Sequence, residues 1–579
     1  MSKVVKKSIP WFLIMSLILS TALIFNLRSS KVEADSADTS VTVGNTLPTF
    51  NSGYEPHEDP ASDGTTPTDV GSDVTFKGTA TDANDDDWKL LICATAGTTG
   101  VTCTGTVICN TAVAVSSNTE ASCAYTALVG DNQSNDWYGY ACDAVGCFGE
   151  SHKVDSSGPP FKVNHSPAFT VYADDGPKGP ATTITWTTTA SDPDSDTTPD
   201  TISLYVCKAA DFTGSACGGS GTWCSDTGKA SDPTCFTTTP RPDGDYAAYG
   251  YVVDSHGFVS VDTAQGTDSS PTVTNSTPSI TNTSIYLLDV DGSGNLTLTG
   301  EQTETANFTV TFIVNDANSC QNISSGDEIS SAFINVRMSE KAQGACDITG
   351  EYDANDCYPD DYASWNPVCA ASSTVDACND NTDTSVGWAC TFPLQYHADP
   401  TVASTPKAAF NWVAAAQAED DDAANTSLID SSTGSNEMDK FMAYDLNTAT
   451  IAYGTVAPDA DSLEKTTTVE ATGNVGLDEN LFGSQLCNDY PTCGDADDIA
   501  IAQQNYNLTQ GQGWGGTGHV DLSGTPTETE LDCSKTTITG TPATANTYWY
   551  LHVPLGQAVD VYTGSNTIEG KVDNENYGA

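Results

Sequence analysis

The sequence predicts an all-β protein made of consecutive antiparallel β-sandwiches, and three observations support this fold class. Short segments such as Val74–Thr81 alternate apolar with polar residues, which is the period of a strand with one buried face. Turn residues interrupt the chain at short intervals, and helical periodicity is hard to find. One block of the chain also occurs twice, so at least two domains share one architecture.

The repeat is visible at both of its ends. The first copy opens with Val74–Asp82 and closes with Tyr138–Cys147, and the second opens with Ile184–Asp192 and closes with Tyr249–Phe258. Four cysteines of the first copy recur in the second at offsets between 112 and 115 residues. They are Cys93, Cys103, Cys109 and Cys123, answered by Cys207, Cys217, Cys224 and Cys235.

The N-terminus has the pattern of a secretory signal. A basic start precedes a mostly apolar run over residues 9–27, and the small residues Val32 and Ala34 come just before Asp35. This pattern predicts export with cleavage after Ala34. The alternative is an uncleaved anchor, because the apolar run is long enough to span a bilayer. Contact with a membrane is expected only through such an uncleaved segment.

The exported chain divides into four predicted sandwiches. The junctions Asn164–Pro167 and Asn275–Pro278 both read N-x-S/T-P, and a residue before proline favours extended geometry. Phe308–Asn318 matches the opening strand of the first copy, but a cysteine-bearing insertion over 346–378 follows it. The predicted segments are a signal peptide at 1–34, a linker with a possible edge strand at 35–71, repeats at 72–165 and 166–277, a divergent sandwich at 278–440 and a C-terminal sandwich at 441–579.

Further strands are expected from the same apolar and aromatic patterns. In the repeats they are Trp88–Cys93 and Trp137–Cys142; in the third sandwich, Trp388–Tyr396 and Ala408–Ala416; in the fourth, Thr466–Asn474, Thr547–Gly556 and Tyr562–Gly570.

The charge of the exported chain is strongly negative. Without the signal, 15 basic residues face 76 acidic residues, a net charge near −61. Nucleic acid is therefore excluded as a partner, because binding it needs a basic surface that displaces counterions. Such repulsion must be screened by salt or neutralised by divalent cations. The two interpretations are calcium-loaded loops and an acidic coat adapted to salt.

All 19 cysteines follow Ala34, which in an exported chain predicts disulfides. Cys142 and Cys147 align with Val253 and Phe258, so both are absent from the second copy, which indicates that they bond to each other. The other four recur, and short separation favours two pairs among the three possible connectivities. The favoured pairs are Cys93 with Cys103 and Cys109 with Cys123, with Cys207, Cys217, Cys224 and Cys235 bonded in the second copy.

The last segment has an odd number of cysteines. Cys487 and Cys493 are expected to pair across a short loop, which leaves Cys533 without a mate. Cys533 is then either a free thiol or the link between two molecules.

Two stretches resemble known surface proteins. The opening strand running into Thr79–Asp86 resembles the tandem immunoglobulin-like or cadherin-like modules of bacterial and archaeal surface proteins. Pro554–Gly556 followed by Val561–Gly564 resembles the terminal β-sandwich of such proteins. The resemblance covers most of the exported chain through short motifs. It implies structural or adhesive work outside the cell, often with calcium.

Carboxylates and amides follow the strands that would lie at one end of such a sandwich. In an immunoglobulin-like strand order, the loops after the opening strand and after the closing strand meet at the same end. Calcium prefers such hard oxygen ligands, but Asp and Asn are also ordinary turn residues, and both interpretations stay open. The predicted calcium ligands are Asp82, Asn84, Asp86 and Asp143 in the first copy and Asp192, Asp194, Asp196 and Asp254 in the second.

A third candidate is local. The segment Asp289, Asp291, Ser293 and Asn295 copies the first positions of a calcium loop. It departs from that pattern because Gly300 occupies the twelfth position and no flanking helix is expected, so a β-turn is an equal alternative.

Catalytic motifs are scarce. Seven histidines are scattered singly, neither HExxH nor GxSxG occurs, and no acid pair stands out among so many carboxylates. We therefore expect no enzyme. The predicted function is a secreted or cell-surface structural protein of a surface layer or extracellular filament, which associates with itself. The alternatives are an adhesin for a surface glycan or protein and, less favoured, an accessory part of a secreted hydrolase.

Overall fold

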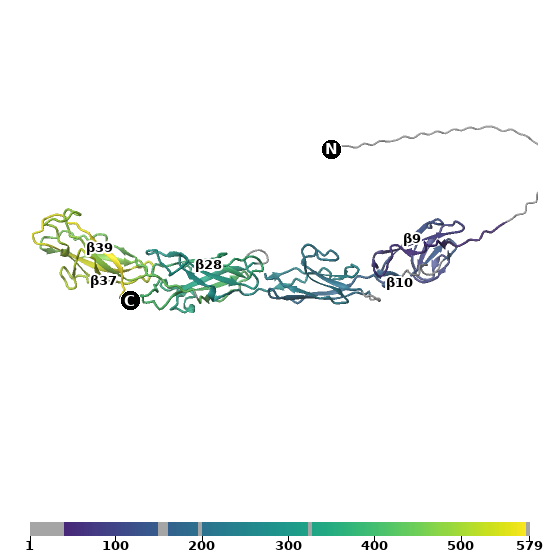
Figure 1. Ribbon diagram of the computed structural model, residues 1–579, viewed down its shortest axis with the longest axis horizontal. Coiled ribbons are helices and arrows are strands. Elements are labelled where there is room, and N and C mark those ends of the chain that lie inside the picture. Colours follow the sequence, from purple (N-terminus) through teal and green to yellow (C-terminus); the bar gives the residue numbers. More distant parts are fainter. Residues whose placement is uncertain (1–39, 149–159, 195–199, 322–326, 433, 575–579) are drawn as a thin grey trace, which may run out of the picture. The chain divides into compact units, whose positions relative to one another are not determined.

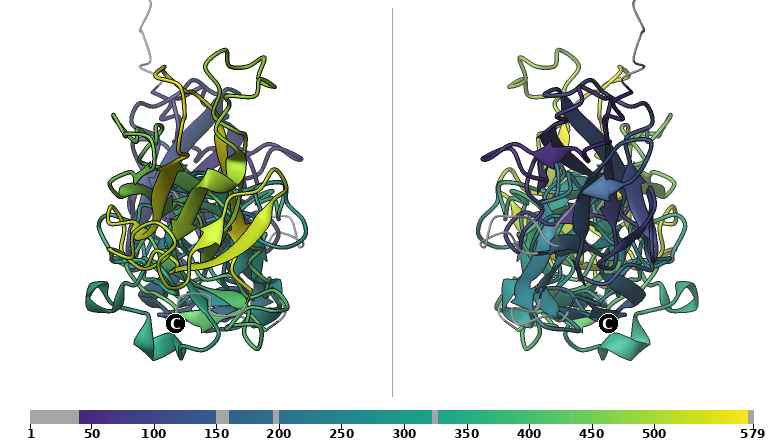
Figure 2. Two further views of the ribbon diagram at one scale, coloured as in Figure 1. Left: turned by 90° about the vertical axis from the view of Figure 1, so that its left-hand side faces the viewer. Right: turned by 90° about the vertical axis from the view of Figure 1, so that its right-hand side faces the viewer.

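The computed structural model describes residues 40–148, 160–194, 200–321, 327–432 and 434–574. The predicted signal peptide therefore lies outside the described residues. Strands joined by loops make up the described chain (Figures 1 and 2). Its short 3-10 helices are η1 (Asn282–Ser284), η2 (Gln343–Ala345), η3 (Thr349–Glu351) and η4 (Ile501–Gln503). None of the helices in this part of the chain is long and apolar enough to cross a membrane.

The contacts divide the chain into two compact units. The first comprises Met1–Pro60, Thr75–Tyr125 and Asp136–Pro159, and the second comprises Ala61–Val74, Thr126–Asn135 and Pro160–Ala579. Among the described residues, every sheet takes its strands from one of four consecutive blocks of sequence. These blocks are the sandwiches described below.

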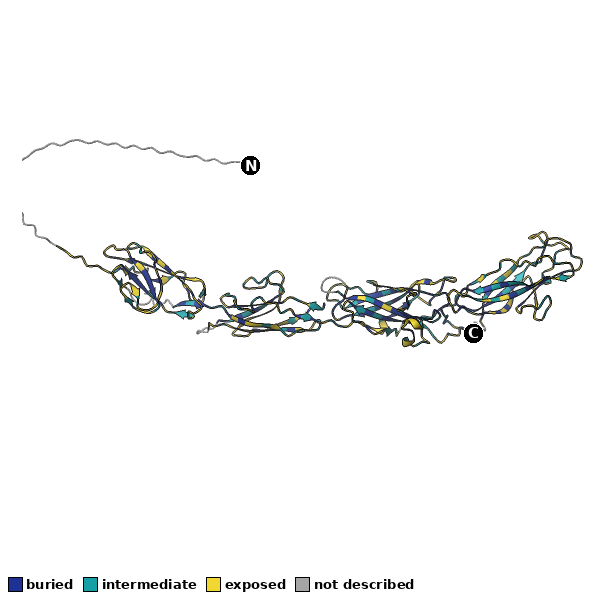
Figure 3. Cartoon of the chain, turned by 180° about the vertical axis from the view of Figure 1, so that it is seen from behind, coloured by how far each residue is buried: buried dark blue, intermediate teal, exposed yellow. Residues whose placement is uncertain are grey.

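The first sandwich holds the opening strand of the repeat. Val74, Phe76 and Ala80 of β4 are buried, so the alternation seen in the sequence is the alternation of burial. Buried and exposed positions lie along the strands throughout the described chain (Figure 3). One sheet contains β1 (Thr49–Phe50), β4 (Asp73–Thr81), β2 (His57–Glu58) and β9 (Glu120–Thr126); the other contains β12 (Cys147–Phe148), β11 (Tyr138–Cys142), β5 (Lys89–Cys93) and β8 (Val107–Asn110). A hairpin is formed by β6 (Thr98–Thr99) and β7 (Thr102–Cys103).

The segment 35–71, expected to be a linker with a possible edge strand, contributes three short strands. β1 and β2 pair with β4, and in the second unit β3 (Thr68–Asp69) pairs with β13 (Phe161–Asn164), which also pairs with β10 (Ser134–Asn135). Prolines separate short extended segments, and these segments pair with strands of the sheets.

The second sandwich repeats this plan. Phe169 and Trp186 of one sheet pack in a common core with Leu204 and Val252 of the other. The sheets are β14 (Ala168–Asp174), β15 (Thr183–Ser191) and β18 (Cys235–Thr238), and β17 (Thr222–Lys229), β16 (Ile202–Cys207) and β20 (Tyr249–Asp254); β19 (Gly244–Asp245) pairs with β21 (Thr272–Val273).

The third sandwich has a large core, and its buried cluster includes Phe312 and Trp388 of one sheet with Ile334 and Trp412 of the other. The strand expected at 408–416 begins at Trp412, because the side chain of this residue anchors it in the core. The sheets are β22 (Ser279–Ile280), β24 (Thr305–Asn315), β28 (Ser385–Leu394) and β27 (Val368–Ala371) with β23 (Tyr286–Leu288), and β26 (Cys357–Tyr358), β25 (Ile329–Met338), β29 (Trp412–Asp420) and β30 (Ile429–Asp430).

The fourth sandwich buries Val469 and Ala471 of one sheet against Leu477 and Leu531 of the other. Its first sheet is β31 (Tyr444–Leu446), β33 (Lys465–Ala471), β38 (Ala543–Val553), β35 (Gln504–Asn507) and β36 (Val520–Asp521) with β32 (Ala460–Asp461), and its second is β37 (Thr527–Cys533), β34 (Leu477–Gly483) and β39 (Asn566–Val572).

Disulfides close loops in all four sandwiches. The pairs favoured by short separation in the sequence are the pairs found in the structure, and the cysteine-bearing insertion adds three more bonds. The bonds are Cys93–Cys103, Cys109–Cys123, Cys142–Cys147, Cys207–Cys217, Cys224–Cys235, Cys320–Cys378, Cys346–Cys357, Cys369–Cys390 and Cys487–Cys493. Cys533 is a free thiol with no exposed surface, so it cannot reach a second molecule as the intermolecular alternative requires.

Candidate cation-binding pockets

The opening strands of three sandwiches are each followed by an aspartate with the same hydrogen bonds. Asp82, Asp192 and Asp316 come directly after β4, β15 and β24. In each, Oδ1 accepts a bond from the backbone N–H two residues later, at 2.7, 2.8 and 2.8 Å. In each, Oδ2 is buried without a hydrogen-bond partner. A buried carboxylate oxygen left unpaired is costly, so each position has an oxygen free for a ligand.

A second aspartate comes where the closing strand ends. Asp143 follows β11, and Asp254 and Asp420 are the last residues of β20 and β29. The Oδ1 atom of each accepts backbone N–H bonds from the turn that follows, at 2.7 to 2.8 Å. The turn therefore fixes one carboxylate oxygen and leaves the other to face the neighbouring loop.

An asparagine from the chain entering each sandwich completes the arrangement. Asn45 Nδ2 donates to Asp143 Oδ2 at 2.8 Å, and Asn275 Nδ2 donates to Asp420 Oδ2 at 3.0 Å. Asn164 instead donates to Asp69 Oδ1 at 2.8 Å, and its own Oδ1 is buried without a partner. All three asparagines stand three residues before a proline. This N-x-x-P spacing could have revealed Asn45, which the linker interpretation passed over.

The first pocket gathers three of the four predicted residues. Asp82, Asp86 and Asp143 offer carboxylate oxygens within 4.8 Å of one another. The Oδ1 atom of Asn84, the fourth predicted residue, accepts bonds from the backbone N–H and hydroxyl of Thr46. Burial opposes ionisation of Asp143, but bonds from Asn45 and from the following backbone outweigh it and hold the pKa of Asp143 below its usual value. The pocket thus presents an ionised carboxylate.

The second pocket contains two of the predicted residues and one that sequence reasoning missed. Asp192, Asp194 and Asp200 offer oxygens within 4.8 Å of one another. Burial, reinforced by the charges of Asp194 and Asp254, raises the pKa of Asp192 to about 7. Burial also raises the pKa of Asp254, which closes the sandwich beside this group. The predicted ligand Asp196 lies outside the described residues.

Two histidines contact the second pocket, a feature that the sequence did not predict. His165 Nδ1 lies 2.8 Å from Asp194 Oδ1, and His256 Nε2 lies 3.0 Å from Asp200 Oδ1. Both are far in sequence from the carboxylates they contact. They hold two of the three carboxylates in place.

Residues of the second and third sandwiches form an acidic pocket for which no ligand was predicted. Asp243, Glu328 and Asp421 offer oxygens within 4.8 Å of one another, although 85 residues separate the first two. Another group of three acids, Asp478, Glu530 and Asp532 of the fourth sandwich, has two exposed members.

The loop from Asp289 to Asn295 is organised as a turn. Asp289 Oδ1 accepts the N–H of Thr297 and Asp291 Oδ1 accepts that of Ser293, both at 2.9 Å. Asn295 Nδ2 donates to Asp439 at 2.8 Å. The side chains of Asp289, Asp291 and Asn295 thus take part in hydrogen bonds of the turn or of the contact with Asp439.

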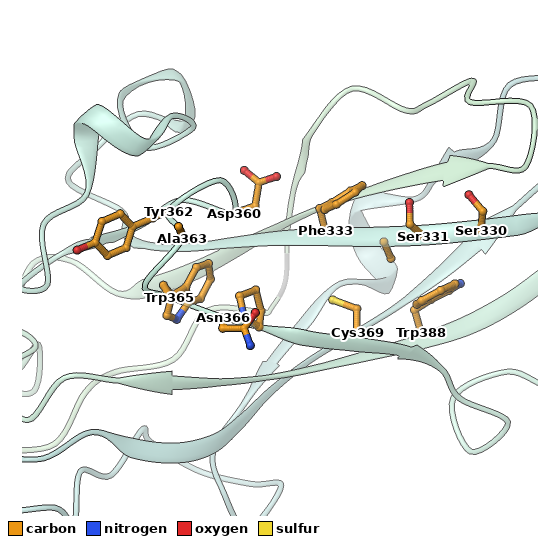
Figure 4. Close-up of a pocket in the computed structure, with 12 residues that line it drawn as sticks. Ser330, Ser331, Phe333, Asp360, Tyr362, Ala363, Trp365, Asn366, Cys369 and Trp388 are labelled. Carbon is orange, nitrogen blue, oxygen red and sulfur yellow. The ribbon is translucent and has the colours of Figure 1, made fainter.

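The third sandwich also carries a cleft of about 380 Å³. Figure 4 shows Phe333, Trp365 and Trp388 spread along it, with the hydroxyls of Ser330 and Ser331 on one side. Phe333 is exposed, and burial raises the pKa of Asp360, another lining residue. The cleft is lined by Ser330, Ser331, Ala332, Phe333, Asp360, Tyr362, Ala363, Trp365, Asn366, Pro367, Cys369 and Trp388.

The fold defines an all-β protein of tandem immunoglobulin-like sandwiches held by disulfides, a build that fits secreted or surface proteins with structural or binding roles. Searches against protein-family models and against curated proteins found no match. Among solved structures, a marsupial T cell receptor is similar over 62% of this chain and 95% of its own, at 8% identity and a TM-score of 0.25.

Two further solved structures are similar at comparable levels. The chicken CNTN1 FN1-FN3 domains match 67% of this chain and 98% of their own, at 9% identity and a TM-score of 0.18. A Salmonella alpha-2-macroglobulin matches 87% of this chain and 30% of its own, at 10% identity and a TM-score of 0.14.

Proposed function

We propose that this protein is an exported structural component of a cell surface or extracellular filament whose sandwiches are stabilised by calcium. The observation that carries the proposal is the threefold recurrence of one arrangement. Asp82, Asp192 and Asp316 each keep one oxygen on the backbone and leave the other buried and unpartnered. A cation that binds these oxygens only in the folded state would stabilise that state.

Calcium suits the donors better than a soft metal does. The first pocket offers carboxylate oxygens only, and the histidines of the second are engaged with carboxylates. Calcium takes six to eight oxygen ligands in flexible geometry, whereas zinc and copper favour nitrogen and sulfur. The carboxylate oxygens of such a pocket, together with water molecules, would supply six to eight oxygen ligands.

Repetition favours a structural role over catalysis. Catalysis needs one constellation, whereas stiffening a chain of domains needs the same device in each. The N-x-x-P junctions place an asparagine at two of the aspartate pairs, so ion binding there would also fix the chain entering the sandwich. The same acidic surface, neutralised by calcium, would allow copies of the chain to approach and associate.

The test compares the oxidised exported chain in calcium with the same chain in chelator, at constant ionic strength. At a calcium concentration 100 times the dissociation constant, one site adds about 2.7 kcal/mol to the free energy of unfolding. Scanning calorimetry should therefore show a calcium-specific rise in melting temperature, smaller in Asp82→Asn and Asp192→Asn. Sedimentation should show assembly that needs calcium. If monovalent salt raised the melting temperature equally, the effect would be general screening of the acidic surface. That result would refute the calcium sites.

The cleft of the third sandwich favours a second candidate, an adhesin for a glycan. Exposed Phe333 offers an apolar face, and Ser331, Asp360 and Asn366 offer hydrogen bonds, which together suit a sugar ring. Phe333→Ser should abolish binding to a glycan array, whereas Phe236→Ser, at an exposed phenylalanine of the second sandwich, should not. No binding by the unaltered chain would exclude this candidate.

A further inference from the structure

Glu328 of the third sandwich is a buried acid whose carboxylate lacks hydrogen-bond partners. It stands just before β25 with no exposed surface, and neither of its carboxylate oxygens has a hydrogen-bond partner. Burying an unpaired carboxylate costs several kcal/mol unless it is neutralised or bound to a cation. Burial, followed by the charges of Asp243 and Asp421, raises the pKa of Glu328 to about 8.

The surroundings of Glu328 are further acids. Oxygens of Asp243 and Asp421 lie within 4.8 Å of one of its oxygens and of each other. Asp316 adds a buried, unpartnered Oδ2, and Asn318 adds a buried, unpartnered Oδ1. Burial and the charges of Asp422 and Asp421 raise the pKa of Asp243 to about 6, and burial raises that of Asp316 to about 7. The carboxylates of four acids therefore lie near one another here.

The pocket takes its ligands from two sandwiches of the second unit. Asp243 belongs to the loop before β19 of the second sandwich, whereas Glu328 and Asp421 flank β25 and β29 of the third. Hydrogen bonds that do not involve these carboxylates hold the loop in place. Asn318 Nδ2 donates to the carbonyl oxygens of Arg241 at 3.1 Å and Thr274 at 3.0 Å, and Arg241 Nη1 donates to Ala317 O at 3.1 Å. The acids are thus brought together despite their mutual repulsion.

We propose that Asp243, Glu328 and Asp421 bind one calcium ion jointly, so that the ion ties the 241–245 loop of the second sandwich to the third. Two features point to a ligand: the close set of three carboxylates, and the fully buried Glu328 aimed into it with both oxygens unpaired. The inference rests on the proposed function only for the choice of calcium as the bound cation. The site itself uses residues outside the repeated aspartate pairs.

The test measures the number of calcium ions bound per oxidised exported chain, by equilibrium dialysis at a calcium concentration that saturates the unaltered chain. Glu328→Gln and Asp243→Asn should each lose one ion. Asp82→Asn should lose a different one, so that the double variant with Glu328→Gln loses two. The exposed Asp497→Asn serves as the matched control and should lose none. Asp421→Asn replaces Glu328→Gln if the near-ultraviolet circular dichroism of the latter differs from that of the unaltered chain.

The other outcomes would overturn the shared site, the connection between the two sandwiches, or the site and the proposed function together. Full stoichiometry in Glu328→Gln and Asp243→Asn, with an ion lost in Asp82→Asn, would overturn the shared site and leave the proposed function standing. If Glu328→Gln loses one calcium ion but Asp243→Asn does not, the site lies within the third sandwich. The proposed connection between the second and third sandwiches would then be wrong. No calcium bound by the unaltered chain would overturn the site and the proposed function together.

Discussion

Glu479 offers a test of buried charge away from the three pockets. It lies in β34 with no exposed surface, its Oε2 accepts the hydroxyl of Thr547 at 2.7 Å, and its Oε1 has no partner. Burial raises its pKa from 4.5 to about 7. The folded state therefore binds one more proton than the unfolded state between these two pH values. Stability from this residue is present below pH 4.5 and is lost as the pH rises towards 7.

The size of the loss follows from the two pKa values. A difference of about 2.5 units at 1.36 kcal/mol each is about 3 kcal/mol. Glu479→Gln keeps the shape of the side chain and an acceptor for Thr547 but removes the charge. The variant should unfold with a free energy about 3 kcal/mol higher than the unaltered chain at pH 8 and nearly equal at pH 4.

Hydrogen exchange read by mass spectrometry suits this comparison because it isolates the fourth sandwich from the others. Peptides that cover β34 and β38 should exchange about a hundredfold more slowly in the variant at pH 8 and at equal rates at pH 4, after correction for intrinsic exchange. Peptides of the second sandwich provide the internal control and should not differ. A difference that is independent of pH, or a variant that exchanges faster at pH 8, would refute the reasoning.

Three further predictions concern stability and reactivity. Burial raises the pKa of Cys533 to about 11, so a thiol reagent at pH 8 should label it only after denaturation, and labelling of the native chain would contradict its burial. Lys535 Nζ lies 2.9 Å from Asp399 with both side chains largely buried, so Lys535→Met should lower the free energy of unfolding by about 3 kcal/mol in calorimetry, while the double variant with Asp399→Asn should recover part of the loss. Removing Cys142 and Cys147 together should destabilise the first sandwich by about 2 kcal/mol in denaturant titrations, and an unchanged midpoint would show that this short loop adds no stability.

Much of the fold was predictable because it depends on local alternation and on repetition. Val74 and Phe76 show the period of β4 within the strand itself, and the joint absence of Cys142 and Cys147 from the second copy indicates their bond without any coordinates. For residues 35–71 the sequence indicated a linker with one possible edge strand, whereas the structure has β1 and β2 paired with β4. Two-residue strands carry too little sequence to show a period, and only their partners reveal them.

The pockets were predictable only in part. Asp82 and Asp143 were found because an immunoglobulin-like strand order places their loops together, and the structure brings them within 4.8 Å. Asn84 was expected to join them, and its Oδ1 accepts two bonds from Thr46, a contact that the sequence did not indicate. Nothing in the sequence marks Glu328 as a proposed ligand. That role depends on the burial of Glu328 and on its proximity to Asp243, which a different sandwich provides.

The position of the acids bears on the two interpretations of the net charge. A coat adapted to salt needs its carboxylates in water, where counterions screen them. Asp82, Asp316 and Glu328 are buried instead, each with an oxygen that has no partner. Solubility gains nothing from a buried charge, and folding is destabilised by one. Such acids are stable when protonated or when paired with a cation, and the proposed calcium sites would pair them with a cation.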